Sequence, residues 1–255
     1  MQLKDRIIVI TGAASGIGKA LAERCKTEGA KAIVCADYNA EGVKAVASDV
    51  GGTAFTVDVS KEADIKNMID SVEKDIGPID LFCSNAGILM GGGAEVPDEE
   101  WQRIWEINVM AHIWAARHMV PIMLARGGGY LLNTASAAGL LSQVGSAPYA
   151  VTKHAAVSFA EWLALTHGAD GLKVSVLCPQ AVRTEMTKGH EDGVASINGM
   201  MAAEDVAEAC VRTIEEETFL VLPHPEVLKY MRNKSADYDR WIAGMQKLNA
   251  QFNTL

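Results

Sequence analysis

The sequence lacks any segment suited to export or membrane insertion. Its N-terminal residues lead directly into an apolar run without a signal-peptide core or cleavage site. No uncharged apolar run reaches the roughly 18 to 20 residues that cross a bilayer. We therefore expect a soluble, cytoplasmic protein with no membrane partner.

Cysteine and histidine are sparse and have no ligand spacing. The five cysteines are widely separated and form no C-x-x-C pair, and the six histidines form no H-E-x-x-H motif. We expect the cysteines to be reduced core residues, and His112, His118 and His154 to be ordinary helix residues. No metal site is predicted.

Positive charge is also in short supply. The 23 Lys and Arg residues are outnumbered by 32 Asp and Glu residues, which gives a formal net charge of -9. Binding to nucleic acid or to an anionic membrane depends on clustered basic side chains, so the composition argues against both. Any bound phosphate would have to be held by backbone N–H groups.

Linkers and repeats are absent as well, and the chain contains only seven prolines. With 255 residues, of which 49% are hydrophobic, it is long enough to bury a core and ordinary in composition. We expect a single domain that covers residues 1–255.

Short runs rich in Val, Ile and Leu alternate with longer amphipathic stretches. Such runs suit strands covered on both faces, as in a parallel sheet built from βαβ units. The predicted fold is a single-domain α/β Rossmann-type structure, a doubly wound parallel sheet of about seven strands with helices on both faces. The predicted strands are 7–11, 32–36, 54–58, 81–84, 130–134, 174–178 and 219–222.

Three helical segments bear on the site. Segment 98–126 has acids in its first turn and ends at a triple glycine, and Pro121 is expected to bend or interrupt it. Segment 147–167 stops at Gly168. The amphipathic segment from about 226 to 248 is predicted as one C-terminal helix that packs on the body or on another subunit.

A glycine-rich turn follows the first strand. Gly12, Gly16 and Gly18 stand where a tight turn needs positive φ and where backbone N–H groups must approach a pyrophosphate at the start of a helix. The spacing G-x-x-x-G-x-G fits neither G-x-G-x-x-G nor the P-loop. Taken alone, this motif could also be a glycine-rich turn that binds no ligand.

Asp37 supports a dinucleotide site, because it ends the second strand about 20 residues after the glycines. A carboxylate there accepts hydrogen bonds from the adenosine ribose hydroxyls of NAD and repels the 2′-phosphate of NADP. The neighbouring Ala13, Ala14, Tyr38 and Asn39 include no basic residue that would favour NADP. We therefore predict NAD as the cofactor, with a solvated strand-end acid as the alternative for Asp37.

Tyr149 and Lys153 lie four residues apart in a predicted helix, which places both side chains on one face. A tyrosine pKa of about 10 is too high for a proton acceptor at neutral pH, and a nearby ammonium group is expected to lower it. Such a phenol can take up the hydroxyl proton as hydride leaves an alcohol, or return it during ketone reduction. Taken alone, a Y-x-x-x-K pair is usually a surface helix pair.

These motifs together resemble the classical short-chain dehydrogenase/reductase family over essentially the whole chain. By that resemblance, Asn108 helps to hold a water-linked proton relay to Lys153, which also binds the nicotinamide ribose. Ser136 orients the substrate oxygen beside Tyr149. The matching pieces, in order, are 11–18, Asn85-Ala86-Gly87, Asn108, Ser136, Tyr149 with Lys153, and Pro179.

Ser136 and Asn108 can also be interpreted from their own positions. Ser136 follows the fifth predicted strand, at the edge where open α/β sheets bind ligands, and its hydroxyl can donate to a developing oxyanion. A serine nucleophile is disfavoured because the flanking residues do not form G-x-S-x-G. Asn108 by itself would be an ordinary buried amide in an apolar helix face.

The resemblance also implies the residues that bind the cofactor. Asp58 and Val59 match positions that contact adenine, although Asp58 by itself would be a loop cap. Gln180 departs from the glycine that usually follows the family's proline. The full predicted set is Gly12, Ser15, Gly16, Ile17, Gly18, Asp37, Asp58, Val59, Asn85, Ala86, Gly87, Tyr149, Lys153, Pro179, Val182 and Thr184.

The substrate is expected between the nicotinamide and a flap from about 185 to 201, opposite residues 88–96. Apolar candidates for its pocket are Leu89, Met90, Leu140, Leu141, Val144, Met186, Ile197 and Met200. We expect an NAD(H)-dependent oxidoreductase that interconverts a hydrophobic secondary alcohol and its ketone. The family implies a homo-oligomer, with a tetramer favoured. An NADPH-dependent 3-oxoacyl reductase and a non-catalytic NAD-binding regulatory protein are the alternatives.

Overall fold

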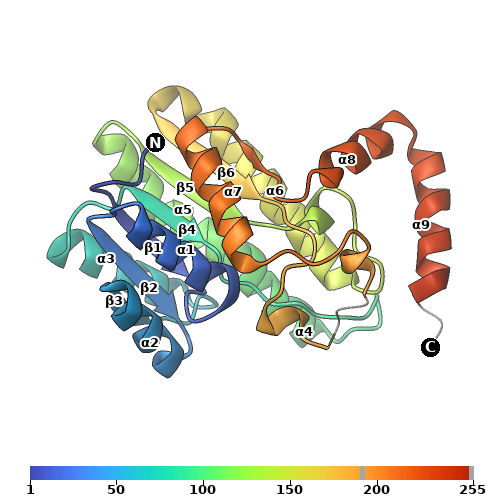
Figure 1. Ribbon diagram of the computed structural model, residues 1–255, viewed down its shortest axis with the longest axis horizontal. Coiled ribbons are helices and arrows are strands. Elements are labelled where there is room, and N and C mark those ends of the chain that lie inside the picture. The colour runs from blue at the N-terminus through green and yellow to red at the C-terminus, as the bar shows by residue number, and fades with distance from the viewer. Residues whose placement is uncertain (190–192, 253–255) are drawn as a thin grey trace.

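A seven-stranded parallel sheet forms the centre of the computed structural model, which describes residues 1–189 and 193–252 (Figure 1). The strand order is β3-β2-β1-β4-β5-β6-β7, and neighbouring strands pair in parallel. The order reverses between β1 and β4, so a crevice is expected at the carboxyl ends of these two strands. The strands are β1 (Ile7–Thr11), β2 (Ala32–Asp37), β3 (Thr53–Thr56), β4 (Leu81–Ser84), β5 (Gly129–Thr134), β6 (Leu172–Leu177) and β7 (Leu220–Val221).

Helices cover both faces of this sheet (Figure 1). One face carries α1 (Gly16–Thr27), α2 (Ala40–Val50) and α7 (Ala203–Glu216). The other carries α3 (Glu62–Asp75), α5 (Ala111–Ala125) and α6 (Ala147–His167). The predicted single-domain, doubly wound α/β fold is therefore confirmed. None of the described helices is both long and apolar enough to cross a membrane.

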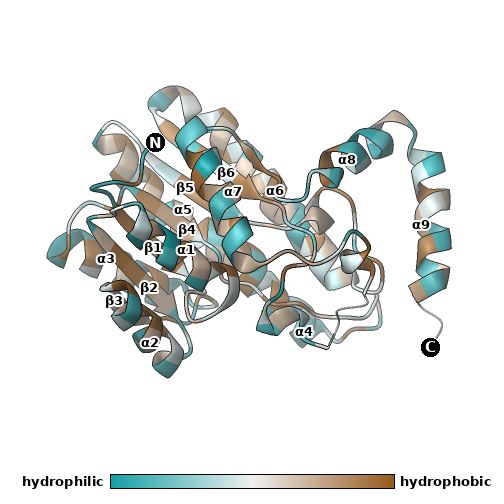
Figure 2. Ribbon diagram, viewed as in Figure 1, coloured by the Kyte–Doolittle hydropathy of each residue, from teal (hydrophilic) through white to brown (hydrophobic). Residues whose placement is uncertain are grey.

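The two buried layers follow from the alternation of side chains along each strand. In β1, Ile8 and Ile10 pack with the layer of α1, α2 and α7, whereas Ile7 and Val9 pack with the layer of α3, α5 and α6. Both faces are covered, so every residue of the strand is apolar or buried. Figure 2 shows the same distribution, with hydrophobic residues along the strands and polar residues on the outer turns of the helices.

The helix predicted over 98–126 is divided in an unexpected place. It consists of α4 (Asp98–Trp105), a π-helical turn (Glu106–Met110) and α5, and α5 continues through Pro121. Pro121 was predicted to bend or interrupt the helix, and the interruption is wrong. The proline removes one N–H group from the helix, but Met119, Val120 and Met123 on the same helix are buried in the core, and this packing outweighs the local loss.

The single C-terminal helix predicted over 226–248 is also wrong. The chain forms α8 (Glu226–Ala236) and α9 (Tyr238–Phe252), with Asp237 between them in an extended conformation at φ -156° and ψ 95°. The Asp237 carboxylate accepts a hydrogen bond from the backbone N–H of Arg240 at 2.9 Å. A carboxylate that caps a new helix competes with continuation of the old one, and the periodicity of the apolar residues carries no sign of this.

Candidate active site

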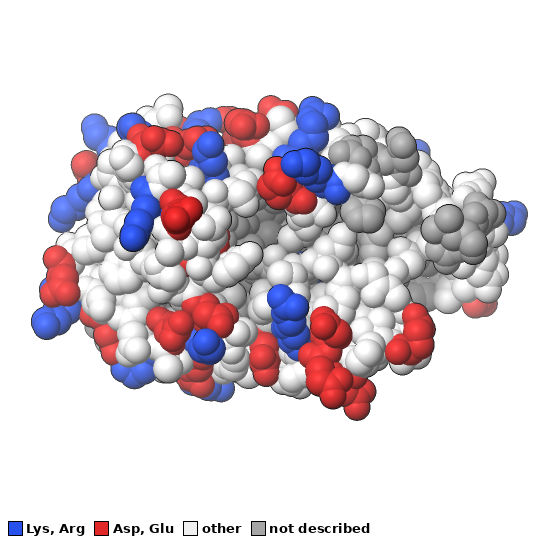
Figure 3. Space-filling view, turned by 90° about the horizontal axis from the view of Figure 1, so that it is seen from below, with Lys and Arg blue, Asp and Glu red and all other residues white. Residues whose placement is uncertain are grey.

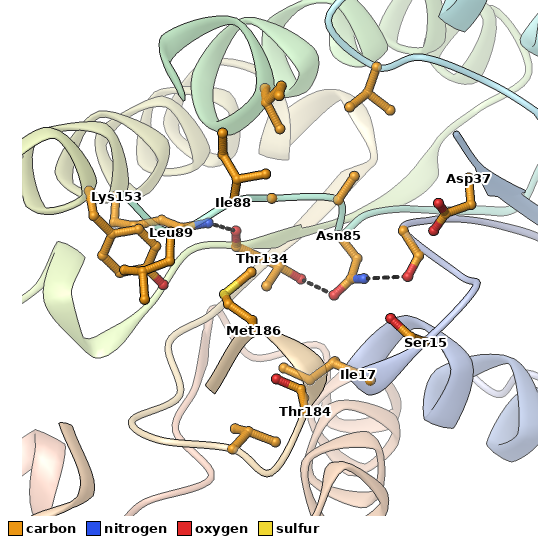
Figure 4. Close-up of a pocket in the computed structure, with 18 of the residues that line it drawn as sticks. Ser15, Ile17, Asp37, Asn85, Ile88, Leu89, Thr134, Lys153, Thr184 and Met186 are labelled. Atoms are coloured by element: carbon orange, nitrogen blue, oxygen red, sulfur yellow. Dashed lines mark hydrogen bonds between the residues drawn. The ribbon is translucent and has the colours of Figure 1, made fainter. Parts of the chain in front are cut away.

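A cavity of about 580 Å³ opens at the carboxyl ends of the strands, where the strand order reverses (Figure 4). On the face shown in Figure 3, acidic and basic side chains are interspersed around uncharged surface. Of the predicted site residues, Gly18, Asn108 and Ser136 are not part of the cavity wall. The predicted residues that line it are Gly12, Ser15, Gly16, Ile17, Asp37, Asp58, Val59, Asn85, Ala86, Gly87, Tyr149, Lys153, Pro179, Val182 and Thr184.

The glycine turn forms one wall of this cavity. Gly12 and Gly16 have positive φ angles of 67° and 52°, which residues with a Cβ rarely adopt. A Cβ at Gly18 would lie 2.1 Å from the carbonyl oxygen of Gly12, so only glycine lets α1 approach the turn this closely. Gly18 thus shapes the turn from behind, while the first N–H groups of α1 face an anion site of the kind expected at a helix start.

Asn85 ties three strands together beside the turn. Its Nδ2 atom donates to the carbonyl oxygen of Thr11 at 3.0 Å, and its Oδ1 atom accepts from the hydroxyl of Thr134 at 3.1 Å. Its backbone N–H donates to the Thr11 hydroxyl at 2.9 Å. Figure 4 shows this chain of side chains along the cavity floor. Asn85 therefore holds the ends of β1, β4 and β5 together at the floor of the cavity.

The carboxylate of Asp37 stands at the end of the cavity away from Lys153 (Figure 4). Its Oδ2 atom accepts from the backbone N–H of Ala14 and its Oδ1 atom from that of Asn39, each at 3.0 Å. Each oxygen retains a lone pair for a further donor. Among the described residues, the basic side chains of the cavity wall are Arg103 on α4 and Lys153 on α6.

Asp58 serves as a loop cap and as part of the cavity wall. Its Oδ1 atom accepts from the backbone N–H of Ser60 at 3.1 Å and from the Ser60 hydroxyl at 2.6 Å, and its Oδ2 atom lies 3.2 Å from Nζ of Lys61. Partial burial acts to raise the pKa of the carboxyl group, but the bonds from Ser60 and Lys61 outweigh it, so the pKa is lowered. Asp58 can therefore cap its loop and still lie where the predicted contact with adenine would be made.

Tyr149, Lys153 and Ser136 meet at the other end of the cavity. Lys153 is buried, its Nζ atom donates to the carbonyl oxygen of Thr134 at 3.1 Å, and the same atom lies 5.6 Å from the centre of the Tyr149 ring. The hydroxyl of Ser136 donates to the carbonyl oxygen of Pro179 at 3.4 Å and lies near enough to the Tyr149 phenol to influence its pKa. The first turns of α6 and the loop after β5 thus bring a phenol, a hydroxyl and an ammonium group together.

The pKa values at this end differ from expectation. Burial raises the pKa of Tyr149, and the nearby hydroxyl of Ser136 offsets only part of the effect. Burial also lowers the pKa of Lys153 to about 8. The prediction that the Lys153 ammonium lowers the pKa of the Tyr149 phenol is wrong for the protein without a cofactor. The ammonium is bonded to the Thr134 carbonyl, and the loss of solvent around the phenol has the larger effect on its pKa.

Asn108 lies behind the cavity, in the π-helical turn, and is fully buried. Its Nδ2 atom donates to the carbonyl oxygen of Ile88 at 2.9 Å and to the hydroxyl of Thr152 at 3.2 Å, and its Oδ1 atom accepts from the N–H of Ile88 at 2.9 Å. A Cβ at Gly87 would lie 3.2 Å from this Oδ1 atom and 3.3 Å from Nζ of Lys153. Asn108 therefore clamps the segment after β4 to α6, beside Lys153.

His112 is a residue whose importance the sequence did not indicate. It is buried on α5, and neither ring nitrogen has a hydrogen-bond partner among the described residues. Burial and the charge of Lys153 lower the pKa of His112 to about 3. Its position four residues after Asn108 was the only local signal, and that spacing could not distinguish it from an ordinary helix residue.

Gln180 replaces the family's glycine without disturbing the turn. Its φ is not positive, so the position does not require glycine. Its backbone N–H donates to Nδ1 of His224 at 3.1 Å, and its Nε2 atom donates to Oδ1 of Asn198 at 3.3 Å, which also accepts from the Tyr230 hydroxyl at 3.2 Å. Gln180 thus joins the cavity wall to the flap and to α8.

Of the residues predicted for the substrate pocket, Leu89 and Met186 line the cavity. Leu140 and Leu141 instead pack against the C-terminal helices, and Ile197 is exposed. Residues 190–192 of the predicted flap lie outside the described residues. Some wall residues were not named individually by the sequence analysis, although Thr187 and Ala195 lie in its predicted flap: Val57, Ser60, Arg103, Glu106, Ile107, Thr134, Ala135, Gln143, Thr187 and Ala195.

A family model described as short chain dehydrogenase matches residues 6–195. The chain belongs to the short-chain dehydrogenase family. The resemblance inferred from the motifs is thereby confirmed. Among curated members, the chain is 34% identical over 253 residues to a 1-deoxy-11-beta-hydroxypentalenate dehydrogenase of Streptomyces exfoliatus, covering 95% of this chain and 92% of the relative.

Two further members illustrate the range of the short-chain dehydrogenases that this chain resembles. The meso-2,3-butanediol dehydrogenase of Serratia marcescens is 34% identical over 193 residues, which cover 74% of this chain and 76% of that protein. A solved short-chain dehydrogenase/reductase from Burkholderia phymatum in complex with NAD superposes with a TM-score of 0.86 at 29% identity. That match covers 94% of this chain and 96% of the other.

Proposed function

We propose that the protein is an NAD(H)-dependent dehydrogenase that interconverts a secondary alcohol and its ketone by hydride transfer. Family membership makes it an oxidoreductase of CH–OH groups with a nicotinamide cofactor. The observation that carries the finer proposal is one continuous cavity, with Asp37 at one end and the group of Tyr149 and Lys153 at the other (Figure 4).

The residues of the cavity fit a dinucleotide. The positive φ angles of Gly12 and Gly16 bring the start of α1 to the cavity, where N–H groups suit a pyrophosphate. The free lone pairs of Asp37 suit the two hydroxyls of an adenosine ribose, and a 2′-phosphate there would meet a carboxylate. The similar structure from Burkholderia phymatum was solved with NAD, which supports the same cofactor here.

The reaction needs a proton acceptor as well as a hydride acceptor. Bound nicotinamide supplies hydride transfer in either direction. In alcohol oxidation, the phenol of Tyr149 takes the hydroxyl proton, and in ketone reduction it returns it. Ser136, whose hydroxyl lies near that phenol, can donate to the same substrate oxygen. Lys153 keeps a positive charge beside the phenol below a pH of about 8.

The proposed substrate is a hydrophobic secondary alcohol or its ketone. Leu89 and Met186 form apolar parts of the cavity wall and lie on the side of Lys153 in Figure 4. Pockets of this kind bind mainly through apolar contact, with a few polar groups that fix orientation. Tyr149 and Ser136 are the polar groups that fix the reacting oxygen.

The proposal is tested with a panel of secondary alcohols and ketones, assayed with NAD(H) and NADP(H). We expect turnover with NAD(H), and Tyr149→Phe should lower kcat/KM by at least about 100-fold because it removes the general acid/base. Tyr238→Phe, an exposed position on α9, is the matched control and should leave activity unchanged. Undiminished activity of Tyr149→Phe would refute the catalytic assignment, and a higher kcat/KM with NADPH would refute the cofactor assignment.

A further inference from the structure

Gln180 begins beside the hydroxyl that is proposed to orient the substrate. The carbonyl oxygen of Pro179, the residue before it, accepts from the Ser136 hydroxyl at 3.4 Å and from the backbone N–H of Ala137 at 2.8 Å. The peptide group that joins Pro179 to Gln180 therefore lies against the loop of Ser136. Gln180 also lines the cavity. Its side chain thus starts close to the place proposed for the reacting oxygen.

Hydrogen bonds at both ends hold the Gln180 side chain in place. Its backbone N–H donates to Nδ1 of His224 at 3.1 Å, and its Nε2 atom donates to Oδ1 of Asn198 at 3.3 Å. The Tyr230 hydroxyl donates to the same Asn198 oxygen at 3.2 Å. Asn198 belongs to the flap and Tyr230 to α8, so two separate segments fix the amide. A group that is held in advance loses less conformational entropy when it binds a ligand.

The amide nitrogen of Gln180 has a second hydrogen to donate. An amide NH2 group can make two such bonds, and within residues 1–189 and 193–252 the Nε2 atom makes only the exposed bond to Asn198. The Oε1 atom is instead buried and has no hydrogen-bond partner in the same residues. A ligand in the cavity can therefore reach the amide through its nitrogen, which makes Gln180 a hydrogen-bond donor.

The chemistry of this donor defines the group that it recognises. Leu89 and Met186, on the Lys153 side of the cavity, provide apolar contact (Figure 4). A substrate that lacks a matching oxygen removes water from the amide without replacing its hydrogen bond, so such a donor discriminates strongly. The amide is uncharged, whereas carboxylates and phosphates are bound most tightly by charged donors such as Arg and Lys. The complementary group is therefore an uncharged oxygen.

We propose that Gln180 selects substrates that carry a second oxygen, as in hydroxy ketones and diols, by donating the second N–H of its amide to that oxygen. This inference rests on the proposed function and narrows its substrate class. The substrate has an apolar frame, Ser136 and Tyr149 bind its reacting oxygen, and Gln180 binds the other. The glycine that usually stands at this position in the family has no side chain, so the family pattern does not supply this contact.

Matched pairs of ketones test this selection. 3-Hydroxy-2-hexanone and 4-hydroxy-2-hexanone are each compared with the ketone that carries a methyl group in place of the hydroxyl. The unmodified protein should reduce at least one hydroxy ketone with a kcat/KM at least about tenfold above that of its methyl partner. Gln180→Leu keeps a side chain of similar size and should remove this preference. Tyr230→Phe removes the other bond to Asn198 but keeps the amide, so it is the matched control and should retain the preference.

Binding without turnover separates this inference from the proposed function. The same ketones are titrated into Tyr149→Phe saturated with NADH and followed by nicotinamide fluorescence. The hydroxy ketone should bind at least about tenfold tighter than its methyl partner, and adding Gln180→Leu should make the two bind alike. Equal binding before that change, or a preference that survives it, would overturn the selection by Gln180. A loss of NADH affinity in Gln180→Leu, equal for every ketone, would assign the amide to the cofactor and overturn it too. Undiminished ketone reduction by Tyr149→Phe would instead refute the proposed function.

Discussion

The Nζ atom of Lys153 donates a hydrogen bond to the backbone carbonyl oxygen of Thr134 at 3.1 Å. This bond joins α6 to the carboxyl end of β5 and keeps the ammonium group below the phenol of Tyr149. The lysine is buried, and burial lowers its pKa from 10.5 to about 8. The folded protein therefore holds this proton less tightly than the unfolded chain does.

That difference predicts a pH-dependent effect of Lys153→Met on stability. At pH 7 both states carry the proton, so the folded state bears the full cost of the buried charge, about 3 kcal/mol for this pKa shift. Between about 8 and 10.5 the folded protein loses the proton and the cost disappears. The variant should thus be more stable than the unmodified protein at pH 7 and equal to it near pH 10.5.

Urea unfolding at the two pH values measures this difference. Lys44→Met, at an exposed position on α2, is the control for loss of one lysine and should show no comparable change with pH. A Lys153→Met variant that is less stable than the unmodified protein at pH 7 would show that the bond to Thr134 outweighs the buried charge.

The close approach of Gly18 to Gly12 predicts a severe effect of one methyl group. Gly18→Ala places a Cβ 2.1 Å from a backbone oxygen, so the turn must shift. We expect a loss of about 1–3 kcal/mol in the free energy of unfolding and weaker NADH binding. Gly168→Ala, where an added Cβ meets nothing within 4 Å, is the control. Denaturant melts and NADH fluorescence titrations would contradict this account if both variants behaved alike.

We predict that the Asp37 carboxylate makes the protein prefer NADH over NADPH. Asp37→Asn retains an oxygen that can accept from the N–H of Ala14, but it removes the charge that repels a 2′-phosphate. We expect the ratio of kcat/KM for NADPH to that for NADH to rise at least tenfold, or about 1.4 kcal/mol. Asp49→Asn, an exposed acid on α2, should leave the ratio unchanged. An unaltered ratio in Asp37→Asn would mean that another feature selects the cofactor.

We predict that the buried His112 ring lowers the stability of the folded protein in mild acid. Because its pKa falls from 6.5 to about 3, the unfolded chain takes up a proton below pH 6.5 that the folded protein excludes. This group therefore lowers the stability of the folded state by about 2 kcal/mol between pH 7.5 and pH 5. His112→Leu should lack that loss. In unfolding experiments at both pH values, the free energy of unfolding of the variant should therefore rise relative to that of the unmodified protein as the pH falls. Parallel behaviour of the two proteins would disprove the assignment.

Much of the fold could be predicted because its signals are local. The apolar run 7–11 and the glycine turn after it determine a buried strand and the start of α1 from neighbouring residues alone. Segment 147–167 became α6 with the predicted bounds, which placed Tyr149 and Lys153 one turn apart. The remaining site assignments from the family motifs stay predictions, although the structure gathers most of them around one cavity.

Other features depend on partners far away in the chain. Leu140 and Leu141 seemed suited to a substrate pocket, but α8 packs on them from more than 80 residues later. Pro121 was expected to bend or interrupt a helix that continues through it, and the helix is divided instead by the π-helical turn around Asn108. Periodicity shows that a residue is apolar, and only the packed structure shows which surface it contacts.

The sequence by itself determined the parallel sheet, the glycine turn, the acid at its side and the spacing of Tyr149 from Lys153, because each follows from residues close together in the chain. The tertiary structure decided the direction of the Lys153 bond, the raised pKa of Tyr149 and the lack of a hydrogen-bond partner for the His112 ring within residues 1–189 and 193–252. The physical reason is desolvation. The pKa and partners of a polar group depend on how much water surrounding segments exclude, and those segments come from the whole chain.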